Sequence, residues 1–329
     1  MSLLERLGLE LPIVQAGLGG GLSGAELAAA VSRAGGLGTV GIFSPVRFVA
    51  ELRRARALSP GRPLAANLLM PFVRPAHVAA LISAEVDVAI FFYGFNRAAV
   101  ERLHAAGVLV LHQVGNEAQA RRALADGADG LIAQGLQAGG HLLAELDTFA
   151  FLPRACALAE GKPVLAAGGI HDAQGVRRAL AAGAAGVLCG TRFLLTEECA
   201  AHPLYKQRVL GAERTIETLL FSFGWYARHR VAPNASTDRW CAARAAGPRA
   251  VALMNRLSGP LGRRMPLSLP AARLQLRSLP LYSPAPALAG MPDRVVDVTP
   301  LYAGESARAI HEILPAAEAV AELSRGVGS

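Results

Sequence analysis

The chain has 329 residues, of which 52% are hydrophobic and 18% are charged. This composition excludes a disordered chain, and the length allows one barrel-sized domain or a barrel with a smaller lobe. The formal net charge of +8 comes almost entirely from arginine, since Lys162 and Lys206 are the only lysines. The arginines form no stripe with interleaved aromatics, so we expect the charge to attract anionic substrates or cofactors and no nucleic acid.

The cysteines and the N-terminal residues indicate the cellular compartment in which the protein is expected. Cys156, Cys189, Cys199 and Cys241 form no CxxC pair and show no metal-like spacing with histidine. No long apolar segment follows the first residues, and no apolar stretch reaches the length that crosses a bilayer. We therefore expect a cytoplasmic protein without a bound metal and without a membrane partner, either a monomer or a homodimer.

Short β-like runs alternate with helix-like segments over about the first 200 residues. The expected strands are Pro12–Ala16, Leu37–Ile42, Leu64–Leu68, Val86–Phe92, Val108–Gln113, Gly130–Gln134, Pro163–Ala167 and Gly186–Cys189. The expected helices include Gly24–Ala34, Pro45–Leu58, Asn116–Asp126 and Asp172–Ala182, with Ser23, Asn116 and Asp172 as N-caps. Eight β/α units predict a closed (β/α)8 TIM barrel, and an open doubly wound sheet is the alternative.

The alternation stops after about Thr196, where the chain becomes richer in arginine, proline and aromatic residues. We expect a barrel over residues 1–201, a smaller and mostly helical lobe over 202–290 that covers the barrel mouth, and a C-terminal return over 291–329. The return is expected to end in an amphipathic helix from about Ala307 to Ser324.

Small residues cluster just after three expected strands. Gly139 and Gly140 precede His141 in one such stretch, Gly168 and Gly169 follow the seventh strand, and Gly190 and Thr191 follow the eighth. In a barrel these positions share the carboxyl-terminal rim, where backbone N–H groups commonly bind a phosphate. Tight turns would also explain the glycines, but two pairs at consecutive strand ends favour a phosphate of a sugar, a nucleotide or a flavin.

The side chains at the other strand ends are neutral amides and one imidazole. Gln15, Asn67, Gln113 and Gln134 each end a strand, and such amides can hydrogen-bond the edge of a flat heteroaromatic ring. No cluster of carboxylates and histidines suits a metal. His141 is the best placed acid–base side chain, although a histidine there can also merely cap a loop. By strand alternation His112 is expected to face the surrounding helices.

Taken together, these residues resemble the nitronate monooxygenase family, formerly called 2-nitropropane dioxygenases, and the related FMN-dependent enoyl-acyl-carrier-protein reductases. The resemblance runs through nearly the whole chain in order. It rests on Pro12–Ala16, Asn67-Leu68, Ala138–His141, Ala167–Ile170, Gly190–Phe193, Asn234–Thr237 with Trp240, and Leu301–Gly304.

The resemblance implies a non-covalent FMN and an oxidoreductase activity. The phosphate would be held by Gly168, Gly169, Gly190 and Thr191, with Gln113, Gln134, Asn67 and the backbone at Gly17 near the ring, and Gly139 and Gly140 at the same site. His141 would be the catalytic base in the oxidation of alkyl nitronates or nitroalkanes with O2 to a carbonyl compound and nitrite. The alternative is an NAD(P)H-dependent FMN reductase of an enoyl thioester, a quinone or another activated alkene.

Three departures from the family pattern concern the substrate side. Gly17-Leu18-Gly19-Gly20 stands where proline and methionine are usual after the first strand, Leu142-Leu143 follows the histidine, and Gly304-Glu305 replaces a frequent Gly-Gln. We expect these changes to leave FMN binding intact and to alter substrate choice.

Overall fold

The computed structural model describes residues 8–259, 272 and 275–327. Eight parallel strands form one sheet in the order β1-β9-β8-β6-β5-β4-β3-β2. They are β1 (Ile13–Gln15), β2 (Gly38–Val40), β3 (Leu64–Leu69), β4 (Val88–Phe92), β5 (Leu109–Val114), β6 (Gly130–Gln134), β8 (Val164–Ala167) and β9 (Gly186–Cys189). All eight expected strands are present, with boundaries shifted by a few residues at most.

The two end strands of this sheet meet and close it. The Leu37 N–H donates to the Ile13 carbonyl at 2.9 Å, and the Gln15 N–H donates to the Leu37 carbonyl at 3.0 Å. These bonds join β1 to the segment that leads into β2, so the predicted (β/α)8 barrel is confirmed and the open-sheet alternative is wrong.

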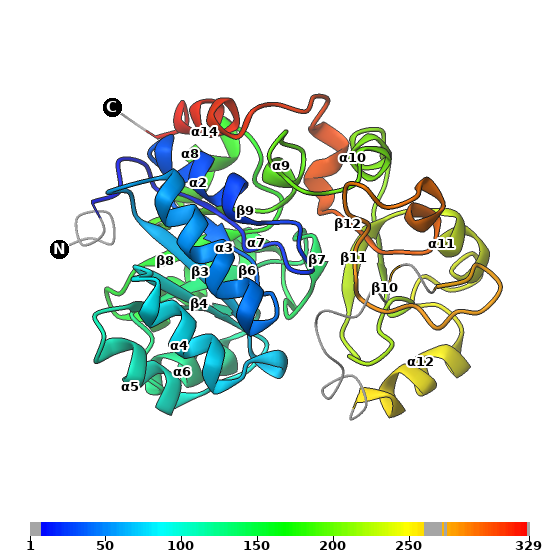
Figure 1. Cartoon of the computed structure of the whole chain (residues 1–329), viewed down its shortest axis with the longest axis horizontal. Coiled ribbons are helices and arrows are strands. Elements are labelled where there is room, and N and C mark those ends of the chain that lie inside the picture. The colour runs from blue at the N-terminus through cyan, green and yellow to red at the C-terminus, as the bar shows by residue number, and fades with distance from the viewer. Residues whose placement is uncertain (1–7, 260–271, 273–274, 328–329) are drawn as a thin grey trace.

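Helices alternate with the strands and cover the outside of the barrel (Figure 1). They are α2 (Ala25–Arg33), α3 (Pro45–Leu58), α4 (Pro75–Ser83), α5 (Arg97–His104), α6 (Glu117–Ala125), α7 (Thr148–Ala159), α8 (Ala173–Ala181) and the short α9 (Thr191–Leu194). A short 3-10 turn, η1 (Met70–Phe72), follows β3. Apolar side chains such as Leu111, Ile132 and Leu165 fill the barrel interior, and larger apolar layers lie between strands and helices.

The expected helix starts are only partly correct. Asn116 and Asp172 accept backbone N–H bonds as N-caps of α6 and α8, as predicted. Ser23 does not cap α2, because it is fully buried and its hydroxyl bonds the Thr39 carbonyl, while Gly24 occupies the cap position. The hydroxyl of Ser23 therefore makes a buried hydrogen bond to β2 and does not cap the helix.

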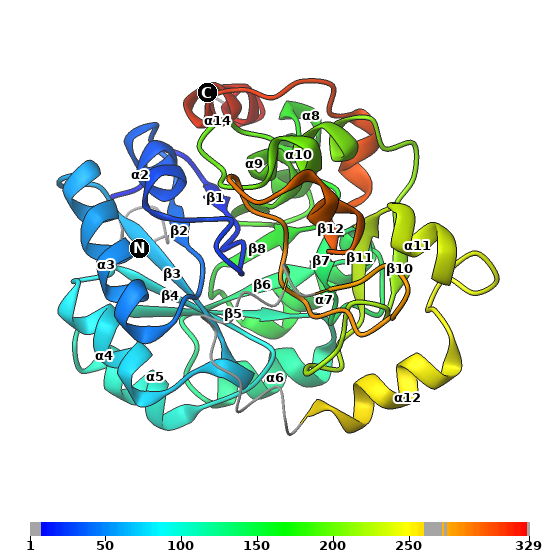
Figure 2. The ribbon, with the colours of Figure 1, turned by 45° about the vertical axis from the view of Figure 1, so that its right-hand side comes forward.

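The lobe lies beside the barrel mouth and is built on a small sheet as well as helices (Figures 1 and 2). Its helices are α10 (Pro203–Leu210), α11 (Ala235–Trp240) and α12 (Arg249–Leu257). The sheet contains β10 (Ile216–Thr218), β11 (His229–Ala232) and β12 (Leu301–Tyr302), and β7 (Gly140–His141) from the barrel side pairs with β11. The sequence pattern indicated a mostly helical lobe and did not reveal this sheet, because its strands are only a few residues long and recruit partners from distant segments.

The C-terminal return packs against the barrel, but less of it is helical than expected. After the 3-10 segments η3 (Asp293–Asp297) and η4 (Glu305–Ala309), the last helix α14 spans Ala316–Ser324. The expectation of a helix from Ala307 onwards is wrong, because Ile310 and Leu314 are anchored in extended chain, where Leu314 pairs with Thr196. α14 contacts α2 and α8, so the final helix does return to the barrel.

The lobe is tied together by the side chain of Asn234. Its Oδ1 accepts the Thr237 N–H as the N-cap of α11, and its Nδ2 donates to the carbonyls of Val296 and Thr299 at 3.0 and 2.8 Å. One buried amide therefore joins α11 to the chain that leads into β12.

Replacing Asn234 by alanine should lower the free energy of unfolding by about 2–3 kcal/mol, because a helix cap is lost and two buried carbonyls lose their donor. Urea unfolding followed by circular dichroism measures the change. Asp238→Ala, on the exposed side of the same helix, is the control and should cost less than about 1 kcal/mol. Equal midpoints for Asn234→Ala and the parent protein would contradict the assignment.

Candidate active site

One cavity of about 570 Å³ opens at the carboxyl ends of the barrel strands, between the barrel and the lobe. This volume lies in the range of sites for small molecules and cofactors. Of the residues expected at the site, all but Gln15 line it: Gly17, Asn67, Gln113, Gln134, Gly139, Gly140, His141, Gly168, Gly169, Gly190 and Thr191. The structure therefore brings together strand ends that are up to about 170 positions apart in the sequence.

The glycines at the rim differ in whether the fold itself requires glycine at their position. Gly168 and Gly169 have φ values of 116° and 74°, which a side chain rarely adopts, and a Cβ on Gly139 would lie 2.3 Å from the Gly304 nitrogen. Gly190 has an ordinary φ, and a Cβ there would make only a normal contact with Ala16. The fold does not require glycine at 190, so the small residue serves the cavity.

The hydroxyl of Thr191 joins this rim to the C-terminal return. It accepts the Gly304 N–H at 2.9 Å, and Thr191 is 7% exposed. The hydroxyl hydrogen is left over, so Thr191 can donate one bond into the cavity beside Gly190.

The amide side chains at the four strand ends make different contacts. Gln113 lines the cavity, and its side-chain amide makes no hydrogen bond within the described residues, so it is available to a ligand. Asn67 makes one long bond, 3.4 Å, from Nδ2 to the Ile90 carbonyl. Gln15 does not line the cavity: it is fully buried, and its Oε1 accepts the Thr39 N–H. The expectation that Gln15 contributes to the mouth is therefore wrong.

Gln134 lines the cavity but uses both ends of its amide on the loop that contains His141. Gln134 Nε2 donates to the His141 carbonyl at 2.9 Å, and its Oε1 accepts the Leu143 N–H at 2.8 Å. This two-ended bond fixes the loop after β6. The side chain therefore positions His141, and the second hydrogen of Nε2 is not used by these two bonds.

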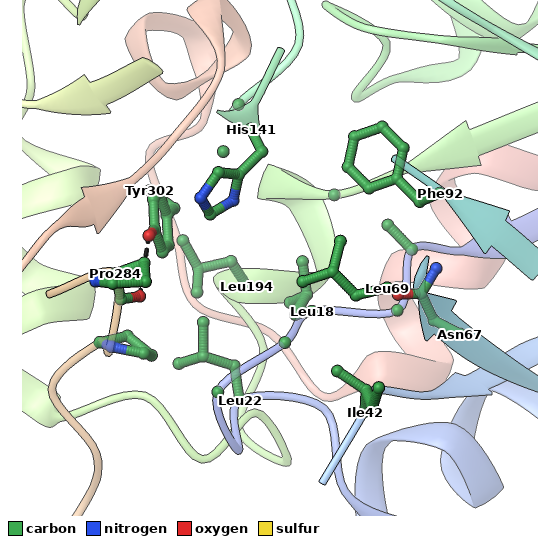
Figure 3. Close-up of a pocket in the computed structure, with 18 of the residues that line it drawn as sticks. Leu18, Leu22, Ile42, Asn67, Leu69, Phe92, His141, Leu194, Pro284 and Tyr302 are labelled. Atoms are coloured by element: carbon green, nitrogen blue, oxygen red, sulfur yellow. Dashed lines mark hydrogen bonds between the residues drawn. The ribbon is translucent and has the colours of Figure 1, made fainter. Parts of the chain in front are cut away.

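His141 points into the cavity above Leu194 and Leu18 (Figure 3). Its ring stacks on Trp225 with centroids 4.0 Å apart, and Tyr302 lies 5.2 Å away. The Nε2 atom is buried and has no hydrogen-bond partner within the described residues. The other ring nitrogen also makes no hydrogen bond within the described residues, and the side chain lines the cavity, so the imidazole is available to a ligand.

Burial holds the pKa of His141 well below its usual value, and the nearby His229 adds to the effect. The imidazole is therefore neutral at pH 7 and able to accept a proton. The carbonyl of Leu142, next to His141, accepts the Tyr93 hydroxyl at 2.9 Å. Tyr93 has a φ of 62°, an unusual conformation for an aromatic residue, which indicates that the surrounding contacts hold it in place.

The sequence did not indicate that Trp225, His229 and Tyr302 surround His141. Trp225 belongs to an aromatic-rich lobe segment, and that enrichment was the signal that could have found it. His229 is fully buried opposite His141 on the neighbouring strand, and Tyr302 lies within the Leu301–Gly304 motif. Phe92 lines the cavity wall, and Phe91 packs in the apolar layer between the strands and the outer helices. His112 bonds the Gly94 carbonyl and, as expected, does not line the cavity.

One departure from the family pattern, Glu305, has a side-chain partner, and another, Leu142-Leu143, does not depend on its side chains for polar contacts. Glu305 pairs with Arg230 of β11 at 3.5 Å, so it links the C-terminal return to the lobe sheet. Leu142 is buried, and the polar contacts of Leu142 and Leu143 go through backbone atoms, which any residue could provide.

Two further findings concern metal binding and membrane crossing. Among the described residues, no group of three or more histidine, cysteine, aspartate or glutamate side chains could hold a metal ion. None of the helices in the described part of the chain has both the length and the apolar character needed to cross a bilayer.

His229 provides a test of the buried cluster through pH. Burial lowers its pKa from 6.5 to about 4, so between pH 7 and pH 5 the unfolded chain takes up a proton that the folded chain refuses. The stability associated with neutral His229 is thus present above pH 6.5 and is lost as the pH falls.

His229→Asn keeps a donor for the Ala227 carbonyl, which His229 Nδ1 contacts at 3.0 Å, and removes the titration. The fall in unfolding free energy from pH 7 to pH 5 should be smaller in this variant by about 2 kcal/mol. Urea unfolding at both pH values measures it, and identical pH dependence in variant and parent would contradict the buried neutral state.

Comparison with known proteins agrees with this geometry. The family model for nitronate monooxygenase matches residues 2–77 and 73–326. A nitronate monooxygenase of Pseudomonas aeruginosa is 33% identical over 267 residues, covering 66% of this chain and 76% of that protein. An indene-carboxyl-CoA dehydrogenase of Mycobacterium tuberculosis, "(3aS,4S,5R,7aS)-5-hydroxy-7a-methyl-1-oxo-octahydro-1H-indene-4-carboxyl-CoA dehydrogenase", is 35% identical over 223 residues, 66% of this chain and 62% of its own length.

Solved structures give the same assignment across nearly the whole chain. FabK from Thermotoga maritima superposes with a TM-score of 0.76 at 27% identity, covering 97% of this chain and 93% of that one. Nitroalkane oxidase from Streptomyces ansochromogenes superposes with a TM-score of 0.75 at 27% identity and covers 98% of both chains. The match spans only about three fifths of the CoA dehydrogenase relatives. The chain belongs to the nitronate monooxygenase family.

Proposed function

We propose that this chain binds FMN and oxidises alkyl nitronates or nitroalkanes with O2 to a carbonyl compound and nitrite. The observation that supports this most directly is the imidazole of His141, which lines a cavity with a glycine-rich rim and makes no side-chain hydrogen bond to the described residues. Family membership and the similarity to a nitroalkane oxidase agree with it.

The residues of the cavity fit a flavin mononucleotide. Backbone N–H groups at Gly168, Gly169 and Gly190, with the Thr191 hydroxyl, suit the phosphate, and the free amide of Gln113 suits the edge of the ring. When bound, FMN would supply the electron-transfer chemistry that no side chain provides. The chain itself has to bind the substrate, remove its proton and exclude water.

Neutral His141 is suited to remove the acidic proton from the carbon that bears the nitro group. Neither of its ring nitrogens bonds another described residue, and the stack on Trp225 and the bonds of Gln134 fix the loop and the ring. A base held in one orientation loses little entropy when the substrate binds. A substrate that already lacks this proton, a nitronate, should need His141 much less.

Replacing His141 by alanine should leave FMN bound and lower kcat/KM for a neutral nitroalkane about 100-fold or more, because the general base is lost. The same variant should retain most of its activity on the preformed nitronate. Nitrite release with 2-nitropropane and with propyl nitronate, measured together with the flavin absorbance, checks both. An equal loss on the two substrates would contradict the role as a base.

Replacing Gly190 by valine should expel the cofactor, because the added atoms would lie in the phosphate site while the backbone conformation stays allowed. We expect at least a tenfold weaker affinity for FMN at an unchanged unfolding midpoint in apoprotein. Gly211→Ala, at the end of α10 and away from the cavity, is the control. Full occupancy of Gly190→Val by FMN would contradict the phosphate assignment.

A reductase is the second candidate, and the superposition on FabK favours it. In that case the chain would reduce an enoyl thioester, a quinone or another activated alkene with NAD(P)H. Anaerobic mixing with NADPH separates the two: rapid loss of the flavin colour supports the reductase, and nitrite release from nitronates without any nicotinamide supports the oxidase.

A further inference from the structure

The cavity continues beyond the predicted cofactor residues into an apolar part, which we call the outer chamber. Its walls include Leu18, Leu22, Ile42, Phe72, Trp225 and Pro284. They come from the loops after β1, β2 and β3 and from two segments of the lobe, and Figure 3 shows Leu18, Leu22, Ile42 and Pro284 around the space below His141. A substrate in the outer chamber would therefore contact mainly carbon atoms.

The outer chamber is held in shape from both sides. Gly20 and Gly21 have φ values of 69° and 99°, and a Cβ on them would lie 2.4 Å from Pro286 and 2.9 Å from Leu288. The glycine-rich loop that departs from the family pattern is thus docked tightly onto the lobe. On the opposite side, Phe72 meets Trp225 edge to face, with centroids 5.2 Å apart. These contacts indicate a preformed chamber.

The chamber offers few polar groups to a ligand. The Tyr302 hydroxyl is already donated to the Pro284 carbonyl at 2.8 Å. Among the described residues that line the cavity, Arg47 is the only one of the Asp, Glu, Lys and Arg types. A sugar or another polyhydroxylated substrate would lose hydrogen bonds to water in such a chamber and regain few.

Arg47 lies where the cavity meets solvent. Its side chain is 57% exposed, its guanidinium stacks over Phe43 at 4.4 Å, and its Nε is 3.4 Å from Glu51 Oε1. The two terminal nitrogens of Arg47 have no partner among the described residues. A planar fork with free donors at a chamber mouth suits a carboxylate or a phosphate.

We propose that the outer chamber binds a bulky carbon skeleton poor in hydroxyl groups, and that an anionic group of the substrate remains at the mouth beside Arg47. The proposal rests on the proposed function, because it names the substrate class of that same site. It assigns the apolar skeleton to the chamber below His141, which leaves the reacting carbon near the base, and it gives the glycine-rich loop a role in shaping the substrate space.

Binding can be measured without turnover through Trp225. The chain has two tryptophans, so Trp240→Phe leaves Trp225 as the only one, and its fluorescence reports on the chamber. Titration of the purified protein with alkanoates from butanoate to decanoate should show affinity rising about fourfold per methylene until the chamber is filled. Affinity that does not change with chain length, or that is equal for a polyol, would overturn the proposal.

The role of Arg47 is tested with ligands of one chain length. Octanoate and octyl phosphate should each bind at least about tenfold more tightly than octanol, and Arg47→Met should remove this difference while leaving octanol unaffected. Arg53→Met, exposed on the same helix, is the matched control. Preference for the phosphate over the carboxylate, or the reverse, identifies the anion, and an unchanged preference in Arg47→Met would remove Arg47 from the site.

The walls are tested with a second pair of variants. Ile42→Trp narrows the chamber and should weaken decanoate binding at least about tenfold, while Val46→Trp places the same side chain at a position that is 86% exposed and should have no effect. Equal binding by both variants would contradict the chamber.

The two proposals can fail separately. Length-dependent binding without nitrite release would refute the proposed function alone, and nitrite release with length-independent binding would refute the chamber alone.

Discussion

The antiparallel pairing of β7 with β11 is the contact on which the site depends. It places His141 directly opposite His229 and joins the loop after β6 to the lobe sheet. A strand of two residues has little stability of its own. The pairing is supported by the two-ended bond of Gln134 and by the hydroxyl of Tyr93, the residue that follows β4. The imidazole is therefore fixed by both halves of the molecule.

This arrangement combines a rigid frame with a chemically reactive interior. The barrel supplies glycines at adjacent strand ends, where backbone N–H groups can approach a ligand, and the lobe supplies Trp225 and His229, which pack around the histidine. Burial keeps the imidazole neutral, and neither of its nitrogens bonds another described residue. The same burial that costs stability at low pH thus prepares the side chain to accept a proton.

The sequence was sufficient for those features that depend on local pattern. Apolar runs with the right spacing predicted the barrel, and glycines after those runs predicted which strand ends meet. Gln134 shows where local pattern fails: its position after a strand was correct, but only the folded chain shows that both ends of its amide bind the 141–143 backbone. The prediction of Ser23 as a helix cap fails for the same reason, since its hydroxyl donates to the carbonyl of Thr39, 16 positions away. The lobe sheet could not be anticipated, because β11 finds its partners at residues 140–141 and 301–302.

The bond between the Thr191 hydroxyl and the Gly304 N–H also bears on biosynthesis. Tyr302, Gly304 and Ser306 line the cavity, and they are translated long after all eight barrel strands. A nascent chain on the ribosome can therefore assemble its cylinder while one side of the cavity is still missing. The pocket is completed only when this late segment, more than 100 positions beyond β9, has emerged from the exit tunnel, so ligand capture must wait for it.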